Sequence, residues 1–263
     1  MAFTDDDIAR YARHLVLREV GGPGQQSLRA ARVFIVGAGG LGGPAALYLA
    51  AAGVGHVTLA DPDTVSLDNL QRQILFRTAD IDASKVETGR RVLEALNPGV
   101  SVAIHYESLT ADNADALLAG HDLVLDGTDR FETRFDVNAA CYRLGLPLVS
   151  GAVGRWDGQV GVFAAGVTRG AAPDARAPCY RCFVAAIPPD AETCERVGVV
   201  GALTGVIGSV MALEAIKWIT GAGKTLDGRI LLFDGLNGTS RTVRLKPDPA
   251  CPVCGDALHN AGA

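Results

Sequence analysis

The chain carries near its N-terminus the run Val33-Phe34-Ile35-Val36-Gly37-Ala38-Gly39-Gly40-Leu41-Gly42. Its first four residues form a short apolar stretch typical of a buried strand. The glycines that follow have the spacing G-x-G-x-x-G and lead into an apolar helical pattern. Glycines let a backbone approach phosphate closely, and a helix N-terminus offers unpaired N–H groups. The run predicts a nucleotide-binding loop, with a glycine-rich turn that binds nothing as the alternative.

A strand–helix rhythm surrounds this loop as far as about residue 150. Apolar strands are expected at 33–36, 57–60, 100–106, 123–126 and 146–149, and helices at 41–52, 84–96, 111–118 and 133–144. Two further helices are expected before the first strand, at 5–19 and 25–31, separated by a break at Gly21-Gly22-Pro23-Gly24. Alternation of this kind predicts a parallel sheet with helices on both faces.

Beyond residue 150 the pattern changes. Antiparallel strands are expected at 159–164, 229–233 and 239–245, on either side of an apolar helix over 202–219. We therefore predict an α/β, Rossmann-like ATP-binding fold whose parallel sheet is extended by antiparallel strands. A single domain over 1–263 is expected, with a nucleotide-binding half at about 30–150 and a second half at about 151–255.

Composition narrows the class of protein. The 263 residues are 48% hydrophobic and 20% charged, which excludes a disordered chain. The net charge is −5 and no Lys/Arg block stands out, so no nucleic-acid partner is expected. The uncharged run Val197–Leu213 is short for a membrane span and rich in glycine, which favours a buried helix. With no signal peptide before the start, we expect a soluble, cytoplasmic protein without a membrane partner.

Two Cys-x-x-Cys pairs, Cys179/Cys182 and Cys251/Cys254, lie in the second half. Soft thiolate ligands in two tight pairs are typical of a closed, tetrahedral Zn²⁺ site. Two disulfides, or buried thiols that happen to be neighbours, are the alternatives, but disulfides rarely persist in a reducing compartment. The pattern predicts a structural zinc that fixes the C-terminal segment to the middle of the chain.

Charged residues at predicted strand ends indicate which nucleotide is bound. Asp61 ends the second strand, where a carboxylate accepts hydrogen bonds from a ribose, a feature that suits NAD, FAD or ATP equally. Arg72 and Lys85 can project over the glycine loop, and Asp129 follows the strand ending at Asp126. Two cations and a carboxylate suit phosphoryl or nucleotidyl transfer with Mg²⁺. Taken singly, each charge could be a solvated surface residue.

Several of these motifs together resemble a known family. They are Arg10-Tyr11-Ala12-Arg13, the glycine loop, Leu67-Asp68-Asn69-Leu70-Gln71-Arg72-Gln73, Lys85, Asp126-Gly127-Thr128-Asp129 and both cysteine pairs. In this order, from about residue 5 to 255, they are similar to the MoeB/ThiF/HesA family of ubiquitin-activating-type adenylyltransferases. The resemblance implies adenylation, by Mg·ATP, of the C-terminal glycine of a small ubiquitin-like sulfur-carrier protein ending in Gly-Gly, with release of pyrophosphate. A molybdopterin pathway is favoured, with a thiamin pathway as the alternative.

The resemblance also implies site residues. The nucleotide would be held by Gly37, Gly39, Gly40, Gly42, Asp61, Asp68, Asn69, Arg72, Lys85, Asp129 and Arg130. The catalytic set would be Arg13, acting on the neighbouring protomer of a homodimer, with Arg72, Lys85 and Asp129, the last as magnesium ligand. The second half would bind the carrier. No rhodanese-like domain follows Cys254, so we expect sulfur to come from a separate donor protein. More distant alternatives are an NAD-dependent oxidoreductase with a zinc-stabilised tail and a non-catalytic nucleotide-binding scaffold.

Three positions leave questions open. Arg130 stands where most relatives have Asn or Ser, and Asp82 stands where glycine is common. Cys194 lies in the polar stretch Glu192–Arg196, where Arg196 is expected to lower the pKa of its thiol. Thiamin-type relatives use such a cysteine to link covalently to the carrier. Because a carboxylate is itself the nucleophile in adenylation, we expect that step to proceed without Cys194, while Cys141, among apolar helix residues, is expected to be a buried thiol.

Overall fold

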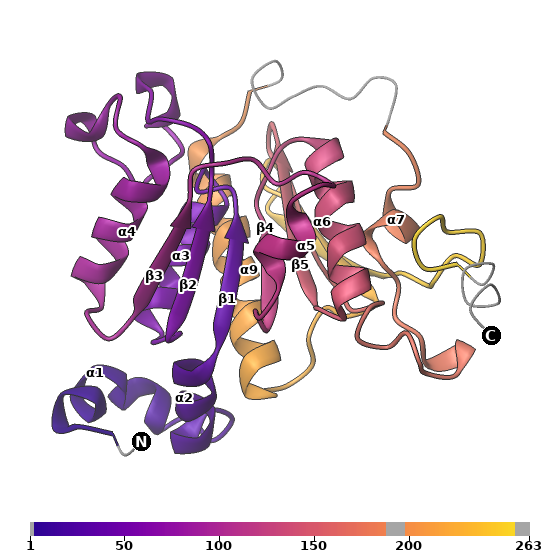
Figure 1. The fold of residues 1–263 in the computed structure, drawn as a ribbon, viewed down its shortest axis with the longest axis horizontal. Helices are drawn as coiled ribbons and strands as arrows, with labels where there is room; N and C mark the ends of the chain where they lie inside the picture. Colours follow the sequence, from indigo (N-terminus) through magenta and orange to yellow (C-terminus); the bar gives the residue numbers. More distant parts are fainter. Residues whose placement is uncertain (1–2, 188–197, 256–263) are drawn as a thin grey trace.

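The computed structural model describes residues 3–187 and 198–255 (Figure 1). Within them one sheet runs in the order β3-β2-β1-β4-β5-β6-β7-β8. Its strands are β1 (Arg32–Val36), β2 (His56–Ala60), β3 (Ser101–His105), β4 (Leu123–Asp126), β5 (Leu148–Gly154), β6 (Asp157–Phe163), β7 (Arg229–Asp234) and β8 (Thr239–Arg244). Neighbours from β3 to β5 are parallel and those from β5 to β8 are antiparallel. The predicted fold class is confirmed.

The helices cover both faces of the parallel part. They are α1 (Asp5–Leu15), α2 (Gly21–Ala30), α3 (Gly42–Ala51), α4 (Lys85–Leu96), α5 (Ala114–Leu118), α6 (Phe131–Leu144), α7 (Tyr180–Phe183) and α9 (Gly201–Thr220), with 3₁₀ turns η1 (Leu67–Asn69), η2 (Thr78–Asp80) and η3 (Pro173–Ala175). Figure 1 shows α1 and α2 at the end of the sheet where β1 begins.

The core has two layers because side chains alternate along each strand. On β1, Val33 and Ile35 belong to the cluster that also contains residues of α3, α4 and α9. Phe34 and Val36 belong to the cluster that contains residues of α5 and α6. All four side chains are almost completely buried, as expected for a strand covered on both faces.

Two predicted boundaries at the N-terminus were wrong. The first helix ends at Leu15, not at residue 19. The second helix begins at Gly21, not at residue 25: Gly21-Gly22-Pro23-Gly24, expected to separate the two helices, forms the first turn of α2. Proline is tolerated in a first helical turn because its missing N–H would have no partner there. A glycine-rich quartet with proline therefore marks the start of this helix.

Strand β5 is longer than predicted. The sequence suggested a strand over 146–149, whereas β5 continues to Gly154 and pairs with β6 in a register from Leu148↔Phe163 to Gly154↔Asp157. Its second half contains small residues with no alternating pattern. The antiparallel partner supplies the hydrogen bonds that hold this segment extended, and a partner is not visible in local periodicity.

Helix α9 is, among the described residues, long and apolar enough by length and composition to cross a membrane. Here it packs on α3 and on strands β5 and β6. A Cβ at Gly208 would lie 2.6 Å from the carbonyl oxygen of Leu41, so the two helices approach closely because this residue is glycine. Ile207 and Met211 of α9 are fully buried in the core. The arrangement is that of a packed core helix, as the sequence predicted.

Strand order places a crevice at one edge of the sheet. Chain connections from β1 run to β2 on one side, while β4 lies on the other. This reversal is the switch point at which open α/β sheets bind ligands, beyond the carboxyl ends of the strands. The glycine loop after β1 and the Asp126-Gly127-Thr128-Asp129 turn after β4 meet at this position.

Asp82 has a backbone φ of 68°, in the left-handed region that favours glycine. Its N–H donates to the carbonyl of Val65, and the chain still delivers Lys85 to the start of α4. The presence of aspartate here therefore does not displace the lysine. Aspartate tolerates this conformation better than most residues because its short polar side chain can bond locally.

We predict opposite effects for two substitutions at this position. Asp82→Val should lower the free energy of unfolding by about 1–2 kcal/mol, because a β-branched residue is strained at positive φ. Asp82→Gly should leave it unchanged or raise it by up to about 1 kcal/mol. Denaturant unfolding measures both, with the same pair at exposed Asp112 as control. Equal effects of valine and glycine at position 82 would contradict the left-handed backbone conformation assigned to Asp82.

Candidate active site

A cleft with a volume of about 600 Å³ opens at the switch point. Most of the predicted nucleotide residues line it: Gly37, Gly39, Gly40, Asp61, Asp68, Asn69, Arg72, Lys85, Asp129 and Arg130. They come from the glycine loop, the segment after β2, the start of α4 and the turn after β4. Residues far apart in the sequence thus meet in one cleft.

The glycine loop is shaped by close backbone contacts. Gly37 has φ of 84°, and a Cβ at Gly42 would lie only 1.8 Å from the carbonyl oxygen of Gly37. Glycine at position 42, the first residue of α3, therefore lets the loop pack directly against the start of the helix. Gly42 itself is not among the residues that line the cleft. Asp61 supports the loop through Oδ2, which accepts from the N–H of Ala38 at 2.8 Å. Burial raises the pKa of the Asp61 carboxyl, although Lys85 opposes this shift.

Lys85 is 5% exposed. Its ammonium nitrogen donates to Oδ2 of Asp63 at 2.9 Å, and its backbone N–H donates to the Asp63 carbonyl. Asp63 is an exposed carboxylate that also lines the cleft, and the sequence analysis missed it. Its position two residues after a strand-end aspartate was the only local signal. The pair holds the Lys85 ammonium inside the cleft.

Arg72 and its neighbours also line the cleft. The Arg72 guanidinium donates from Nη1 to the Asp68 carbonyl at 3.1 Å, and the Arg72 carbonyl accepts from the hydroxyl of Thr204 on α9. Gln73 was also missed as a lining residue. It is 5% exposed, and its Oε1 has no hydrogen-bond partner among the described atoms. A buried acceptor of this kind suits a site that receives a polar ligand.

Asp129 and Arg130 also line the cleft, and both are exposed. The turn that carries Asp129 is held by Asp126. Its Oδ1 accepts from the N–H of Thr128 at 3.0 Å and from the Thr128 hydroxyl at 2.6 Å. Burial raises the pKa of the Asp126 carboxyl. Arg130 occupies the N-cap of α6, where its donor-only guanidinium makes no capping hydrogen bond.

Arg13 is not part of this cleft. It is exposed on α1, and α1 packs at the other edge of the sheet. There the hydroxyl of Tyr11 accepts from Nδ2 of Asn97, just before β3 begins. Arg13 therefore cannot reach the nucleotide site of its own chain.

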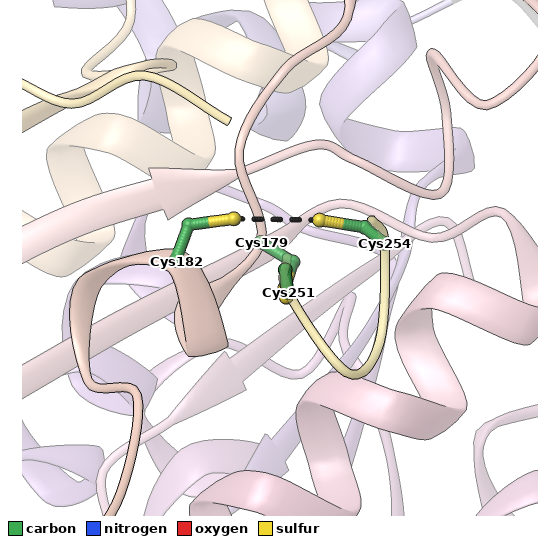
Figure 2. A group of neighbouring side chains, drawn as sticks. All are labelled: Cys179, Cys182, Cys251 and Cys254. Carbon is green, nitrogen blue, oxygen red and sulfur yellow. Dashed lines mark hydrogen bonds between the residues drawn. The ribbon is translucent and has the colours of Figure 1, made fainter. Parts of the chain in front are cut away.

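The four paired cysteines converge as predicted (Figure 2). Their sulfur atoms all lie within 4.8 Å of one another, with 3.5 Å between Cys179 and Cys251 and 3.4 Å between Cys182 and Cys254. A disulfide needs about 2.05 Å, so the disulfide alternative is wrong. Four sulfurs around zinc lie about 3.8 Å apart, given bonds of about 2.3 Å in tetrahedral geometry. The observed cluster fits that size.

The surroundings of the sulfurs also suit a cation. The N–H of Asp248 donates to Sγ of Cys182 at 3.3 Å, and the N–H of Val253 donates to Sγ of Cys251. Hydrogen bonds with Cys179 and Cys254 lower the pKa of the Cys182 thiol, whereas bonds with Cys182 and Cys254 raise the pKa of Cys179. The charge of one thiolate thus makes deprotonation of the next thiol less favourable. A bound divalent cation would offset this repulsion. The donor set fits structural zinc.

The remaining two cysteines differ in status. Cys141 is buried on α6, as predicted, and burial raises the pKa of its thiol. Cys194 lies outside the described residues.

Comparison with known proteins identifies the family. A model of the ThiF family matches residues 11–253. The chain belongs to the ThiF family. It is 44% identical over 258 residues to the sulfur carrier protein adenylyltransferase of Thermus thermophilus, covering 97% of this chain and 94% of that one. It is 44% identical over 252 residues to the molybdopterin-synthase adenylyltransferase of Escherichia coli, covering 96% and 98%.

Other relatives are longer. The adenylyltransferase and sulfurtransferase MOCS3 of Anopheles gambiae is 46% identical, and the match covers 96% of this chain but 56% of that protein. Among solved structures, E. coli MccB in complex with MccA-N7isoASN has a TM-score of 0.81 at 21% identity, covering 95% of this chain and 75% of the other. This likeness supports the fold. The relatives share the name adenylyltransferase, and the ThiF-family chain described here is an enzyme of that type.

We predict that the protein binds one zinc per chain through the four cysteines. Cys182→Ser or Cys254→Ser should lose the metal and folding stability together, because metal binding and folding are coupled in such sites. Metal analysis and thermal unfolding of protein purified without chelators measure both.

Cys141→Ala is the matched control for loss of a buried thiol. It should lower stability while the zinc content stays at one per chain. Zinc-free wild-type protein, or full zinc occupancy in Cys182→Ser, would contradict the prediction.

Proposed function

We propose that the protein uses Mg·ATP to adenylate the C-terminal glycine carboxylate of a small ubiquitin-like sulfur-carrier protein, with release of pyrophosphate. The observation that carries the proposal is the convergence of Arg72, Lys85 and Asp129 around the glycine loop in one cleft. The two relatives that the chain matches over nearly their whole lengths, named sulfur carrier protein adenylyltransferase and molybdopterin-synthase adenylyltransferase, support the substrate class.

The pathway we favour is molybdopterin biosynthesis, in the cytoplasm. The relative named molybdopterin-synthase adenylyltransferase supports it, since the match covers 98% of that protein. The alternative is a thiamin-type carrier with Cys194 as the covalent residue. The sulfur itself would come from a separate donor protein in either case.

The chemical difficulty is that both reactants are anionic. The carrier's carboxylate must approach the α-phosphate of ATP, and negative charge then builds on the phosphoryl oxygens and on the departing pyrophosphate. Lys85, already held inside the cleft, would exchange its partner Asp63 for a phosphate oxygen. Arg72 would turn from the Asp68 carbonyl toward the phosphates. A carboxylate is a nucleophile at neutral pH, so the reaction needs positioning of the two groups and no general base.

The carboxylate of Asp129 would hold magnesium in the cleft. Bound Mg²⁺ supplies charge neutralisation to the phosphate chain. Carboxylate oxygen is a ligand type that Mg²⁺ prefers, and the Asp129 carboxylate lines the cleft and is exposed. Asp61 would accept hydrogen bonds from the ribose, and Gly39 and Gly40 leave room for the nucleotide next to Gln73 and Thr204.

A groove next to the cleft offers a path for the carrier. It has a volume of about 670 Å³ and is lined by β5, β6, β7 and β8. Ala152, Val153 and Gln159 line both the groove and the cleft. A carrier seated on these strands could pass a thin Gly-Gly tail over β5 toward the phosphates. This supports the second half as the carrier-binding part of the domain.

Pyrophosphate exchange into ATP tests the function. We expect exchange with a molybdopterin-type carrier and none with the same carrier lacking its final glycine. A thiamin-type carrier is assayed in parallel. Exchange with that carrier alone, or a thiol-labile carrier adduct on Cys194, would assign the thiamin alternative. Absence of exchange with every carrier would refute the proposal.

Asp129→Ala should lower the exchange rate by about 10²–10³, since it removes the proposed magnesium ligand. The fold should stay intact because the side chain is exposed. Asp112→Ala, a change to another exposed aspartate away from the cleft, is the matched control and should keep the wild-type rate. Near-normal exchange by Asp129→Ala would show that this residue is not the ligand.

We also propose a homodimer in which Arg13 acts on the partner's ATP. Its place at the far edge of the sheet from its own cleft supports action in trans. Mixing inactive Arg13→Ala with inactive Asp129→Ala should restore activity, because each hybrid dimer contains one intact site. Random subunit exchange predicts about a quarter of the wild-type rate. No recovery after verified subunit exchange would place Arg13 outside catalysis in trans.

A further inference from the structure

A buried arginine connects the thiol cluster with the turn that carries Asp129. Arg134 on α6 is 6% exposed. Its guanidinium donates from Nε to the carbonyl of Thr128 at 3.0 Å and also from Nη2 to the same oxygen. From Nη1 it donates to the hydroxyl of Tyr180 at 3.3 Å. The residue immediately before Asp129 is therefore held by two bonds from a cation.

A buried carboxylate compensates this cation. Asp126 is fully buried and accepts hydrogen bonds from Thr128 in the same turn. Its second carboxylate oxygen accepts from the Ser150 hydroxyl at 3.3 Å. Burial is the largest single influence and would lower the pKa of Arg134, but Asp126, Tyr180 and Asp129 together outweigh it, so that pKa is raised. Arg134 thus stays charged, and its bonds to the Thr128 carbonyl are charge-assisted.

The turn between these two charges cannot shift freely. A Cβ at Gly127 would lie 2.8 Å from the backbone nitrogen of Gly42, so the turn rests directly on the first residue of α3. Gly37 lies next to the same turn, because a Cβ there would meet Thr128 at 3.4 Å. Movement of the turn would displace both Asp129 and the glycine loop.

Tyr180 links this arrangement to the metal centre. It stands between Cys179 and Cys182, and its side chain is almost completely buried. Its N–H donates to Oδ1 of Asn138 at 2.7 Å, and its ring packs edge-on against Phe163 with 5.4 Å between ring centres. The direction of its hydroxyl thus depends on the backbone turn that the two cysteines form. Bound zinc would fix that turn through their sulfurs.

We propose that Arg134 and Tyr180 are positioning residues. Through them, the zinc-binding turn of Cys179 and Cys182 sets the orientation of the Asp129 carboxylate. The cysteine site then serves adenylation as well as folding. This inference rests on the proposed function for the role of Asp129. Arg134 also lines the cleft, where the charge of Asp129 acts on it, and its hydrogen bonds go to Thr128 and Tyr180. Its positioning effect on Asp129 is assigned to the turn that these bonds hold.

The test uses full-length zinc-loaded protein and two variants. Tyr180→Phe keeps the ring packing and loses only the hydroxyl. Arg134→Lys keeps the charge near Asp126 and loses the forked donors. Tyr106→Phe, an exposed tyrosine, and Arg143→Lys, an exposed arginine on the same helix bonded to Asp115, are the matched controls. Zinc content is measured for every protein and should stay at one per chain.

Two readouts are expected to change. The exchange rate should fall about 10-fold in Tyr180→Phe and about 100-fold in Arg134→Lys, the range for hydrogen bonds to charged groups. The Mg²⁺ concentration that gives half-maximal rate should rise in both, while the controls behave as wild type. The double variant should match Arg134→Lys alone, because Tyr180 acts through Arg134.

Binding of Mg²⁺ with a non-hydrolysable ATP analogue, measured by calorimetry, repeats the test without a carrier. It should show the same weakened Mg²⁺ dependence in Tyr180→Phe, which covers the case in which Arg134→Lys fails to fold. Failure of all carriers with normal nucleotide binding would refute the proposed function and leave this coupling measurable. Wild-type Mg²⁺ dependence in Tyr180→Phe, or additive losses in the double variant, would overturn the inference.

Discussion

Backbone segments approach one another around the glycine loop more closely than any side chain would allow, and the site depends on this. A Cβ at Gly42 would meet the Gly37 carbonyl at 1.8 Å, and one at Gly201 would meet the Gln71 carbonyl at 2.1 Å. Gly127 and Gly208 bring the Asp129 turn and α9 against the same region. The start of α3 is thereby enclosed by the glycine loop, the Asp129 turn and α9. The enclosure brings the backbone N–H groups of the loop close to the charged side chains of the cleft.

The electrostatic state of the cleft follows from that enclosure. The buried ammonium of Lys85 pairs with the exposed carboxylate of Asp63. An ion pair with one solvated member is weak, so a phosphate can replace Asp63 at small cost. The Arg72 guanidinium donates to the Asp68 carbonyl and its charge acts on the exposed Asp68 carboxylate, contacts that a phosphate can likewise replace. The resting structure therefore keeps both cations in place while leaving them available to an anionic ligand.

Sequence reasoning succeeded where the signal was local. The glycine spacing, the strand-end aspartates and the cysteine pairs each sit within a few residues, and their contexts predicted one cleft and one thiol cluster. It missed Asp63, Gln73, Arg134 and Tyr180 because their roles come from partners distant in the chain: Arg134 and Tyr180 are 46 positions apart. It also misplaced the start of α2 and the end of β5, where a first helical turn and an antiparallel partner override local composition.

Strand β5 joins the two halves of the chain. It pairs in parallel with β4, which the Asp129 turn follows, and antiparallel with β6, which lines the groove. Ala152 and Val153 at its far end line both cavities. A ligand tail lying along β5 would therefore meet the nucleotide cleft without crossing a domain boundary, since the sheet is continuous there. The cysteine cluster fixes the segment after β8 to α7, and α7 packs on α6, so the second half is tied at two places to the elements that present Asp129. The cleft and the groove are therefore built on the same continuous sheet.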